Sequence, residues 1–226
     1  MKLENIIPWG RSKKEYMAMF NLSQEDVLNK KILGCGDGPS SFNTEVDYEG
    51  GEIVSIDPLY AYSKKEIMQR IDEVKDEVMA QVKANVENFV WKNIPDIESL
   101  EFIRIESMME FLMDYEDGKE EGRYIEAQLP SLPFEDDSFD LALSSHLLFL
   151  YSEHLDEVFH KKAVEEMLRV AKEVRIFPLV TLTNEPSPFV VPVMEHLQER
   201  GYKVSIEKSG YEFQKGADEM LRIVKR

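Results

Sequence analysis

Short apolar runs alternate along this chain with longer segments in which apolar residues recur every three or four positions. The short runs predict strands, and the longer segments predict helices between most of them. The expected strands are at about 30–34, 52–57, 123–128, 139–145, 173–180, 202–208 and 219–225. Strand alternating with helix is typical of a doubly wound, mostly parallel sheet. The last two runs are too close for a crossover helix, so they predict a terminal antiparallel hairpin in a seven-stranded α/β fold.

Residues 63–122 interrupt this alternation after the second expected strand. Their first part carries an apolar stripe at three- and four-residue steps, with charged residues on the other face, at Ile67, Ile71, Val74, Val78 and Val82. This pattern predicts a helical insertion. Its apolar face serves either as ordinary core or as a cap that closes over a substrate. With an N-terminal helical segment at 1–29, the chain is interpreted as a single domain over 1–226.

The strongest sign of a ligand is the glycine turn Gly34-x-Gly36-x-Gly38, which follows the first expected strand. Glycine permits positive φ and lets backbone N–H groups approach a ligand. The second strand ends at Asp57, about twenty residues past Gly36, which is the spacing of a ribose-binding acid. Each part alone has an ordinary interpretation, as a tight turn or as a turn residue before Pro58. Together they favour a nucleotide-type cofactor at the carboxyl edge of the sheet.

The charge balance narrows the class of partner. The chain has 44 acidic and 27 basic residues, for a net charge of −17. Such a field repels phosphate backbones and anionic membranes, so a small-molecule substrate is favoured over nucleic acid or a membrane surface. Cys35 is the only cysteine, which excludes an internal disulfide and suits a cytoplasmic protein. Within the glycine turn we expect Cys35 to serve as a small residue rather than as a nucleophile.

Three separated segments resemble the class I, Rossmann-like S-adenosylmethionine-dependent methyltransferases. They are Gly34-Cys-Gly-Asp-Gly38, Val54-Ser-Ile-Asp57, and Gln128-Leu-Pro-Ser-Leu-Pro-Phe-Glu-Asp-Asp-Ser-Phe-Asp140 followed by Leu141-Ala-Leu-Ser-Ser-His146. The resemblance covers about residues 30–226 and is interrupted by the insertion. The segments Gly10-Arg-Ser-x-x-Glu-Tyr16 and Asp57-Pro-Leu-Tyr60 are further similar to an uncharacterised prokaryotic branch, which supplies no substrate.

The resemblance implies S-adenosylmethionine as the cofactor and assigns roles by position. The turn residues would face the methionine part and the ribose, and these are Gly34, Cys35, Gly36, Asp37 and Gly38. Asp57 would bind the ribose hydroxyls, while the adenine would lie against Pro58, Leu59, Gln128 and Leu129. Ser145 and His146 end the fourth strand, near the transferable methyl group. Arg11, at the start of an expected helix, is a candidate to reach a ligand carboxylate.

One position departs from the family pattern. The family usually has an acidic residue two places before the first glycine, and this chain has Ile32 there. Either Asp37 or backbone carbonyls replace that anchor, or the cofactor site is weakened.

Three of the four histidines, His146, His154 and His160, lie within fifteen residues. On one helix, steps of eight and six residues turn by about 80° and 240°, so the three would not converge on a metal ion. We expect a helix that begins after Leu148 to hold His154 and His160 at a surface or an interface. His146 is the candidate catalytic base, with a purely structural role as the alternative. Residues that could shape the acceptor pocket are Tyr151, Tyr115, Met108 and Met109.

The leading hypothesis is methyl transfer from S-adenosylmethionine to a small molecule, or to a peptide side chain, by in-line displacement. Geometry supplies most of the acceleration in such a reaction, so a dedicated base is optional. A nicotinamide-dependent oxidoreductase fits less well, because the third glycine of its pattern would fall at Pro39. A non-catalytic protein that binds the cofactor for regulation stays open because of Ile32. The oligomeric state is also left open.

Overall fold

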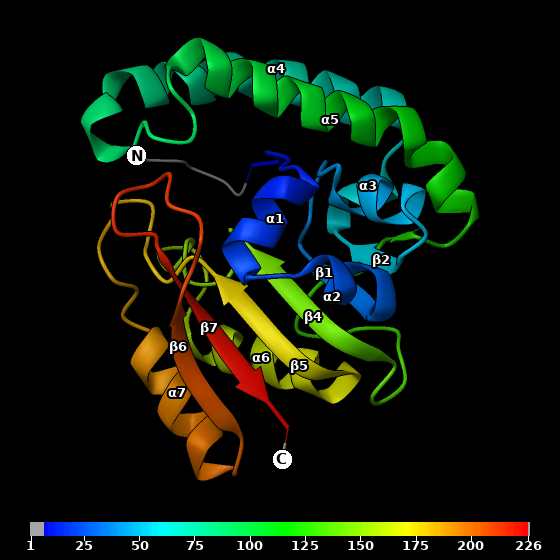
Figure 1. The fold of residues 1–226 in the computed structure, drawn as a ribbon, viewed down its shortest axis with the longest axis vertical. Coiled ribbons are helices and arrows are strands. Elements are labelled where there is room, and N and C mark those ends of the chain that lie inside the picture. The colour runs from blue at the N-terminus through cyan, green and yellow to red at the C-terminus, as the bar shows by residue number, and fades with distance from the viewer. Residues whose placement is uncertain (1–6, 226) are drawn as a thin grey trace.

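The computed structural model describes residues 7–225, so Met1–Ile6 of the expected N-terminal segment lie outside the described residues. The core is a seven-stranded sheet in the order β3-β2-β1-β4-β5-β7-β6. The strands are β1 (Lys31–Cys35), β2 (Glu52–Ile56), β3 (Tyr124–Ile125), β4 (Phe139–Ser145), β5 (Ala171–Phe177), β6 (Lys203–Lys208) and β7 (Glu219–Val224). β3, β2, β1, β4 and β5 are mutually parallel, whereas β7 runs antiparallel to both β5 and β6 (Figure 1). The predicted fold class, with its terminal hairpin, is confirmed.

Alternate residues of β1 face opposite sides of this sheet. Ile32 packs on the side of α1 (Lys13–Phe20), α2 (Gln24–Asn29) and α3 (Phe42–Tyr48). Leu33 packs on the side of α6 (Glu157–Val170) and α7 (Val190–Glu199). Both side chains are fully buried. The side chain of Ile32 therefore belongs to the apolar core, in contact with the N-terminal helix rather than with a polar site.

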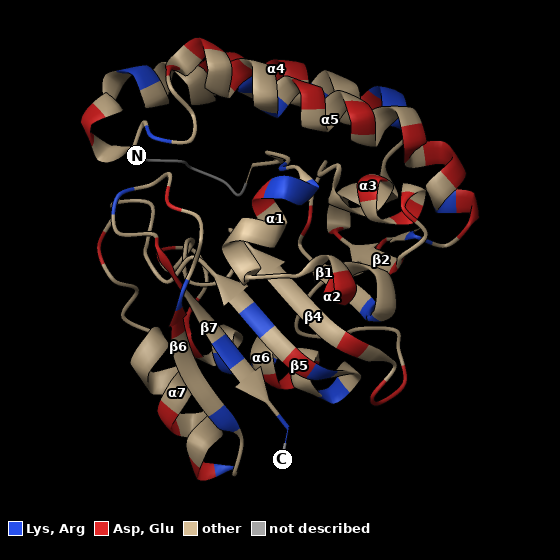
Figure 2. Ribbon diagram, viewed as in Figure 1, with Lys and Arg blue, Asp and Glu red and all other residues tan. Residues whose placement is uncertain are grey.

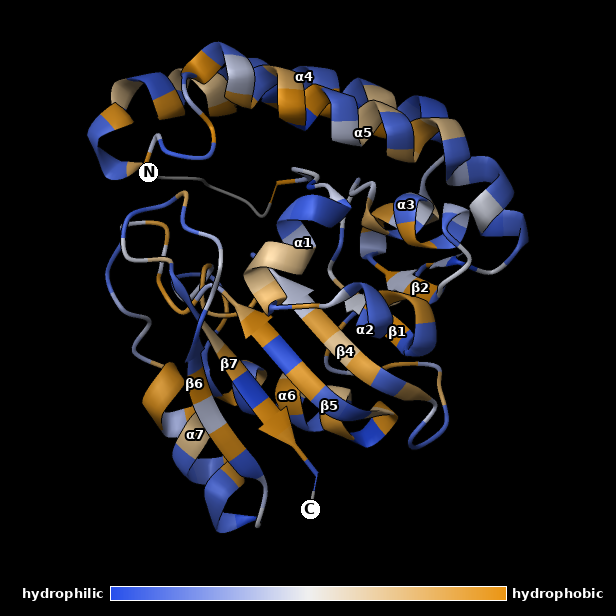
Figure 3. Ribbon diagram, viewed as in Figure 1, coloured by the Kyte–Doolittle hydropathy of each residue, from blue (hydrophilic) through white to orange (hydrophobic). Residues whose placement is uncertain are grey.

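The insertion forms an arch over the carboxyl ends of the parallel strands (Figure 1). It begins after the short helix η1 (Pro58–Ala61) and consists of α4 (Lys64–Ala84), η2 (Val86–Asn88) and α5 (Ile97–Glu120). The predicted stripe of α4 is buried along its whole length, from Ile67 to Val82. Hydrophobic and hydrophilic residues alternate around both helices, whereas the strands of the sheet are predominantly hydrophobic (Figure 3). We call residues 63–122 the cap.

The cap is fastened to the body along α5. Arg104 forms a two-pronged ion pair with Glu15 of α1, at 2.6 Å for each nitrogen–oxygen contact. Closer to its C-terminus, Tyr115 donates to the carbonyl oxygen of Tyr60 at 3.0 Å. Asp114 accepts two hydrogen bonds from Arg123 at 2.7 and 2.8 Å. α4, by contrast, packs mainly against α5. The cap is thus held down through its second helix.

The turn between the two cap helices is also tied to the body, at a place we call the tip (Asn88–Val90). The Val90 amide donates to the Phe213 carbonyl at 2.7 Å, and the Lys215 amide donates to the Asn88 carbonyl at 3.0 Å. The side chain of Asn184 donates a further hydrogen bond to the Asn88 carbonyl at 2.8 Å. The arch is therefore closed at its far end by the loops that follow β5 and β6.

One expectation about the histidines is wrong. The helix after β4 begins at Glu157 rather than after Leu148, because Asp156 caps it by accepting a hydrogen bond from the Phe159 amide at 2.7 Å. His154 therefore precedes the helix. His160 is fully buried rather than interfacial, and its Nε2 accepts a hydrogen bond from the Phe149 amide at 3.0 Å. This histidine holds the loop after β4 in place.

Acidic residues are distributed over the outer faces of the helices, including both helices of the cap (Figure 2). No helix within residues 7–225 is both long enough and apolar enough to span a membrane.

Candidate active site

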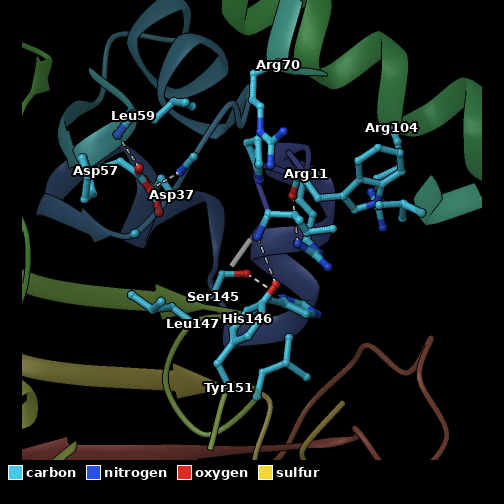
Figure 4. Close-up of a pocket in the computed structure, with 18 of the residues that line it drawn as sticks. Arg11, Asp37, Asp57, Leu59, Arg70, Arg104, Ser145, His146, Leu147 and Tyr151 are labelled. Carbon is cyan, nitrogen blue, oxygen red and sulfur yellow. Dashed lines mark hydrogen bonds between the residues drawn. The ribbon is translucent and has the colours of Figure 1, made fainter. Parts of the chain in front are cut away.

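A cavity of about 790 Å³ lies between the carboxyl edge of the sheet and the cap. Its walls come from the N-terminal segment, the glycine turn, the ends of β2 and β4, the loop before β4, and both cap helices (Figure 4). The candidate residues on its wall are Arg11, Gly36, Asp37, Gly38, Asp57, Pro58, Leu59, Gln128, Leu129, Ser145 and His146. Gly34 and Cys35 lie outside this lining, and the Cys35 side chain is fully buried in the core. Residues about 135 positions apart in sequence are thus gathered at one edge.

The glycines of the turn are required for different reasons. A Cβ on Gly34 would lie 1.7 Å from Oδ2 of Asp37, so this glycine makes room for a carboxylate of the protein itself. Gly36 has a φ of +72°, and its Cβ would lie 2.5 Å from Cδ2 of Leu147. A Cβ on Gly38 would have no atom of residues 7–225 within 4 Å, although its φ is +55°. Gly38 therefore borders open space, where a ligand can approach the backbone.

Asp37 is buried at the base of the turn. Its Oδ1 accepts a hydrogen bond from the hydroxyl of Tyr16 at 2.8 Å, and its Oδ2 accepts one from the hydroxyl of Ser55 at 2.6 Å. Burial raises the pKa of Asp37 to about 6; the two hydrogen bonds oppose this rise and the nearby charge of Asp57 adds to it. This carboxyl group therefore changes charge close to neutral pH.

Asp57 links the glycine turn to η1. Its Oδ2 accepts a hydrogen bond from the Gly38 amide at 2.9 Å, and its Oδ1 accepts one from the Leu59 amide at 2.8 Å. Burial raises the pKa of Asp57, and the two amides counteract part of that rise. Each carboxylate oxygen has a second lone pair, so Asp57 can still accept hydrogen bonds from two hydroxyls of a ligand.

Arg11 presents an unsatisfied donor at the cavity wall. Its Nη1 donates to the Trp9 carbonyl at 3.1 Å, while its buried Nε has no hydrogen-bond partner among residues 7–225. Burial, and next the positive charge of Arg104, lower the pKa of Arg11. A buried guanidinium donor without a partner is costly, so the position favours an anionic ligand group.

Arg104, by contrast, is fully compensated. Burial raises the pKa of Glu15, but the charge and hydrogen bonds of Arg104 outweigh it and hold that pKa at about 2. The hydroxyl of Tyr211 also donates to Glu15, at 2.9 Å. Glu15, Arg104 and Tyr211 thus form a neutral, buried cluster, of which Arg104 reaches the cavity wall.

His146 follows the last residue of β4 and adopts a left-handed conformation, with a φ of +56°. Non-glycine residues rarely adopt this conformation, and such strained positions are frequent at functional sites. The His146 amide donates to the Phe177 carbonyl at 2.7 Å, which holds the backbone in place. The ring of His146 lies at the cavity wall beside Ser145 (Figure 4).

The hydrogen bonds of Ser145 assign the tautomer of His146. The Ser145 hydroxyl lies 2.9 Å from Nδ1 of His146 and donates toward the sulfur of Met19 at 3.8 Å. We therefore assign the proton to Nδ1, which leaves the lone pair on Nε2. Burial, together with the charges of Arg11 and Arg104, holds the pKa of His146 well below 6.5. The imidazole is neutral at pH 7 and able to accept a proton.

Of the four residues expected to shape an acceptor pocket, only Tyr151 lies on the cavity wall. Tyr115 is buried and binds backbone carbonyls, Met108 is buried in the core under the cap, and Met109 is exposed. The wall instead includes residues that sequence reasoning missed, such as Trp9, Arg70, Phe89, Leu182 and Phe213. Most of these come from loops without periodicity, although the helical pattern of α4 did place Val78 and Val82 on one face. Residues 7–225 hold no cluster of three metal-ligating side chains.

Comparison with known proteins agrees with this geometry. Residues 101–174, from α5 to the first half of β5, match the family described as a methyltransferase domain. The uncharacterised protein MJ0045 of Methanocaldococcus jannaschii is 34% identical over 224 residues, which cover 99% of this chain and 98% of that protein.

Two solved methyltransferase structures are similar to this chain at low sequence identity. Magnesium protoporphyrin IX methyltransferase from Synechocystis, with S-adenosylhomocysteine bound, is 9% identical with a TM-score of 0.49, covering 90% of this chain and 77% of that one. A S-adenosylmethionine-dependent methyltransferase from Aquifex aeolicus is 14% identical with a TM-score of 0.46, covering 93% of both chains.

The strand order is that of a doubly wound, Rossmann-like fold, and residues 101–174 match a methyltransferase domain. The chain belongs to one family with the M. jannaschii protein. The residues present fit S-adenosylmethionine, because the cavity is lined by an open backbone at Gly38, a carboxylate at Asp57 and the guanidinium of Arg11.

Proposed function

We propose that this protein transfers a methyl group from S-adenosylmethionine to a small-molecule acceptor, with a peptide side chain as the less favoured alternative. The proposal rests on one observation: Gly38, Asp57, Ser145 and His146 all line the same cavity. A cofactor site and a neutral base thus open into one space. The net charge of −17 disfavours nucleic acid as the acceptor.

The cofactor would be held from the strand ends. Asp57 accepts the ribose hydroxyls, and the adenine lies among Pro58, Leu59, Gln128 and Leu129. The backbone of the glycine turn approaches the methionine part of the cofactor. Asp37 supplies the negative charge that an acidic residue at position 32 supplies in the family pattern, where this chain has Ile32. The guanidinium of Arg11, at the cavity wall, donates to a carboxylate. These roles use the donors and acceptors that the described residues leave available.

When bound, the cofactor supplies a methyl carbon on a sulfonium: the acceptor's lone pair forms the new bond, and the electrons of the broken carbon–sulfur bond stay on sulfur. His146 Nε2 takes the proton that the acceptor's hydroxyl, amine or thiol loses. Ser145 fixes the orientation of that imidazole. The cap, which belongs to the same single domain as the sheet, excludes water. It also holds donor and acceptor in line, and this alignment provides most of the acceleration of methyl transfer.

Binding and turnover are tested separately. Isothermal titration with S-adenosylmethionine, S-adenosylhomocysteine and NAD decides the cofactor, and NAD binding without sulfonium binding would end the proposal. Turnover is measured as S-adenosylhomocysteine formed with a panel of hydroxyl, amine and thiol acceptors. Loss of at least tenfold in rate for His146→Asn, with cofactor affinity unchanged, supports the base. Full activity of that variant reduces His146 to a structural role.

A regulatory protein that binds the cofactor without turnover is the second candidate. The observation in its favour is that Ile32 is fully buried in the apolar core, so this position provides no acidic anchor. Tight cofactor binding together with no methyl transfer to any acceptor, including extracts of the source cells, would favour this candidate.

A further inference from the structure

The cavity extends well beyond the residues proposed to hold the cofactor. One side is lined by α4 from Glu66 to Val82, a span of about 24 Å at 1.5 Å per residue. Ile67, near the start of that span, packs in one cluster with Leu59, beside the proposed adenine site. Val82, at its other end, packs with Phe89 at the tip. The cavity therefore has a near half beside the cofactor residues and a far half under the tip.

Two apolar walls border the cavity away from the cofactor residues. The tip wall comes from one hydrophobic cluster: Trp9, Val82, Phe89, Leu100 and Phe213. The loop wall comes from another: Ile7, Leu150, Tyr151, Leu155 and Leu182. Phe89 stacks on Phe213 with ring centroids 4.9 Å apart, which gives the tip wall a flat aromatic element. All ten residues face the same cavity.

Two polar side chains of this region, Arg104 and Gln214, are already paired, and Arg11 is assigned above to the cofactor carboxylate. Arg104 is paired with Glu15 through two hydrogen bonds of 2.6 Å. The Gln214 side-chain nitrogen donates to the Thr181 carbonyl at 2.6 Å and to Asn184 at 2.8 Å. The charged residues of α4 on the cavity wall, Glu66, Arg70 and Glu73, all lie in its first half. A charged ligand group in the far half would lose its hydration without gaining a partner.

Closure of the arch limits the size of the occupant. The tip is bound to the loops after β5 and β6 by the three hydrogen bonds described above, and α5 is bound to the body by Arg104 and Tyr115. The cavity is only partly covered, and a small molecule can occupy it without breaking these contacts.

We propose that the methyl acceptor is an uncharged, largely apolar small molecule whose body lies between the tip wall and the loop wall, with its nucleophilic atom directed to His146. This inference rests on the proposed function, since it names the substrate class of the same site. The apolar walls exclude ionic acceptors because of the desolvation cost, and the aromatic pair at the tip favours a flat or ring-bearing body.

The test compares two fluorescent probes of the same shape on protein saturated with S-adenosylhomocysteine. N-phenyl-1-naphthylamine is uncharged, and 1-anilinonaphthalene-8-sulfonate adds one negative charge to the same frame. We expect the uncharged probe to bind with at least tenfold higher affinity. Phe213→Asn should weaken that binding at least tenfold, while Phe102→Asn, a matched change at a phenylalanine that is 65% exposed on α5, should leave it unchanged.

The outcomes separate the two proposals. If the wild-type protein binds no S-adenosylhomocysteine by calorimetry, the proposed function fails. If it binds S-adenosylhomocysteine but binds the sulfonate probe as well as the uncharged one, or neither probe, the inference alone is overturned. Unchanged probe binding in folded Phe213→Asn overturns it too. Should Phe213→Asn fail to fold, Leu155→Asn makes the same test from the loop wall.

Discussion

The hydroxyl of Tyr16 lies 2.8 Å from Oδ1 of Asp37 and donates a hydrogen bond to it, so that the N-terminal helix contacts the glycine turn directly. Ser55 of β2 holds the other oxygen at 2.6 Å. Gly34 leaves the space into which this carboxylate fits. Asp37 thus supplies a buried negative charge at the turn. The family usually has an acidic residue two places before the first glycine, and this chain has Ile32 there.

Cofactor affinity should therefore depend on pH through Asp37. Its pKa is raised to about 6 by burial, so the carboxylate is charged above pH 7 and becomes neutral as the pH falls through about 6. We expect S-adenosylmethionine affinity to fall below pH 6 by up to about tenfold per pH unit, because the neutral acid no longer attracts the cofactor's positive charges. Isothermal titration between pH 5 and 8 measures this directly.

Asp37→Asn is the matched variant for that experiment. It should show low affinity at every pH and no step near 6. The pKa of His146 lies well below 6.5, so this histidine is not the source of such a step. A step of the same size in Asp37→Asn would place the titrating group elsewhere; the other ionisable groups that interact with Asp37 are Tyr16, Cys35, Asp57 and Tyr60.

Asp57→Ala should weaken S-adenosylmethionine affinity at least ~10-fold. The change removes the acceptor proposed for the ribose and also the bonds to the Gly38 and Leu59 amides. Glu52→Ala, at the exposed start of the same strand, is the control and should have no effect on affinity. If Asp57→Ala binds as tightly as the wild type, the ribose does not lie at this carboxylate.

The strands and the near half of the site could be predicted from the sequence because they follow local rules. The short apolar runs, the glycine spacing and the acid at the end of β2 are all short-range signals. β3 is shorter than expected, since the chain leaves the sheet after Ile125 and turns at Gln128 to pair with Ser131. Ala127, Gln128 and Leu129 of this loop therefore line the cavity rather than extend the sheet.

The far half could not be predicted, for a physical reason. Phe213 and Leu182 lie in loops, and their place on one wall depends on where the tip of the cap docks. The sequence also did not predict that Arg104 is buried. α5 carries exposed apolar side chains such as Phe102 and Met113 as well as buried ones, so its pattern does not identify the inner face. Only the partner Glu15, 89 positions earlier, explains a fully buried arginine.

The Glu15–Arg104 pair makes a testable contribution to stability. Arg104→Met should destabilise the fold by about 3–5 kcal/mol in urea unfolding, because Glu15 stays buried without its cation. Adding Glu15→Gln should recover much of that loss. The pKa of Glu15 is about 2, below its usual 4.5, so its contribution is present above pH 4.5 and is lost as the pH falls through about 2.

Arg70→Met is the control for the ion pair. Arg70 pairs with Glu73 at 3.3 Å at the edge of the cavity, and both side chains are about half exposed, so such a pair contributes about 0–1 kcal/mol. Equal stabilities of Arg70→Met and Arg104→Met would mean that burial does not decide the strength of these contacts.

Asn184 offers a way to loosen the tip without disturbing the walls. Its side chain donates to the Asn88 carbonyl, and its φ of +67° is one that glycine adopts without strain. Asn184→Gly should therefore keep the loop and remove two hydrogen bonds: the one to Asn88 at the tip, worth about 1 kcal/mol, and the one that Asn184 accepts from Gln214. We expect amide hydrogen exchange at Val90 and Lys215 to accelerate about fivefold, since both amides close the tip.

Asp137→Gly is the control for the effect of introducing a glycine at a position with positive φ. Asp137 has a φ of +55° in the loop before β4 and makes no contact with the tip among the hydrogen bonds of residues 7–225. Its substitution should leave exchange at Val90 unchanged. If Asn184→Gly also leaves Val90 unchanged, the tip is held by its backbone hydrogen bonds and by the stacking of Phe89 on Phe213 rather than by the Asn184 side chain. Phe89→Ala would then be the variant that accelerates exchange.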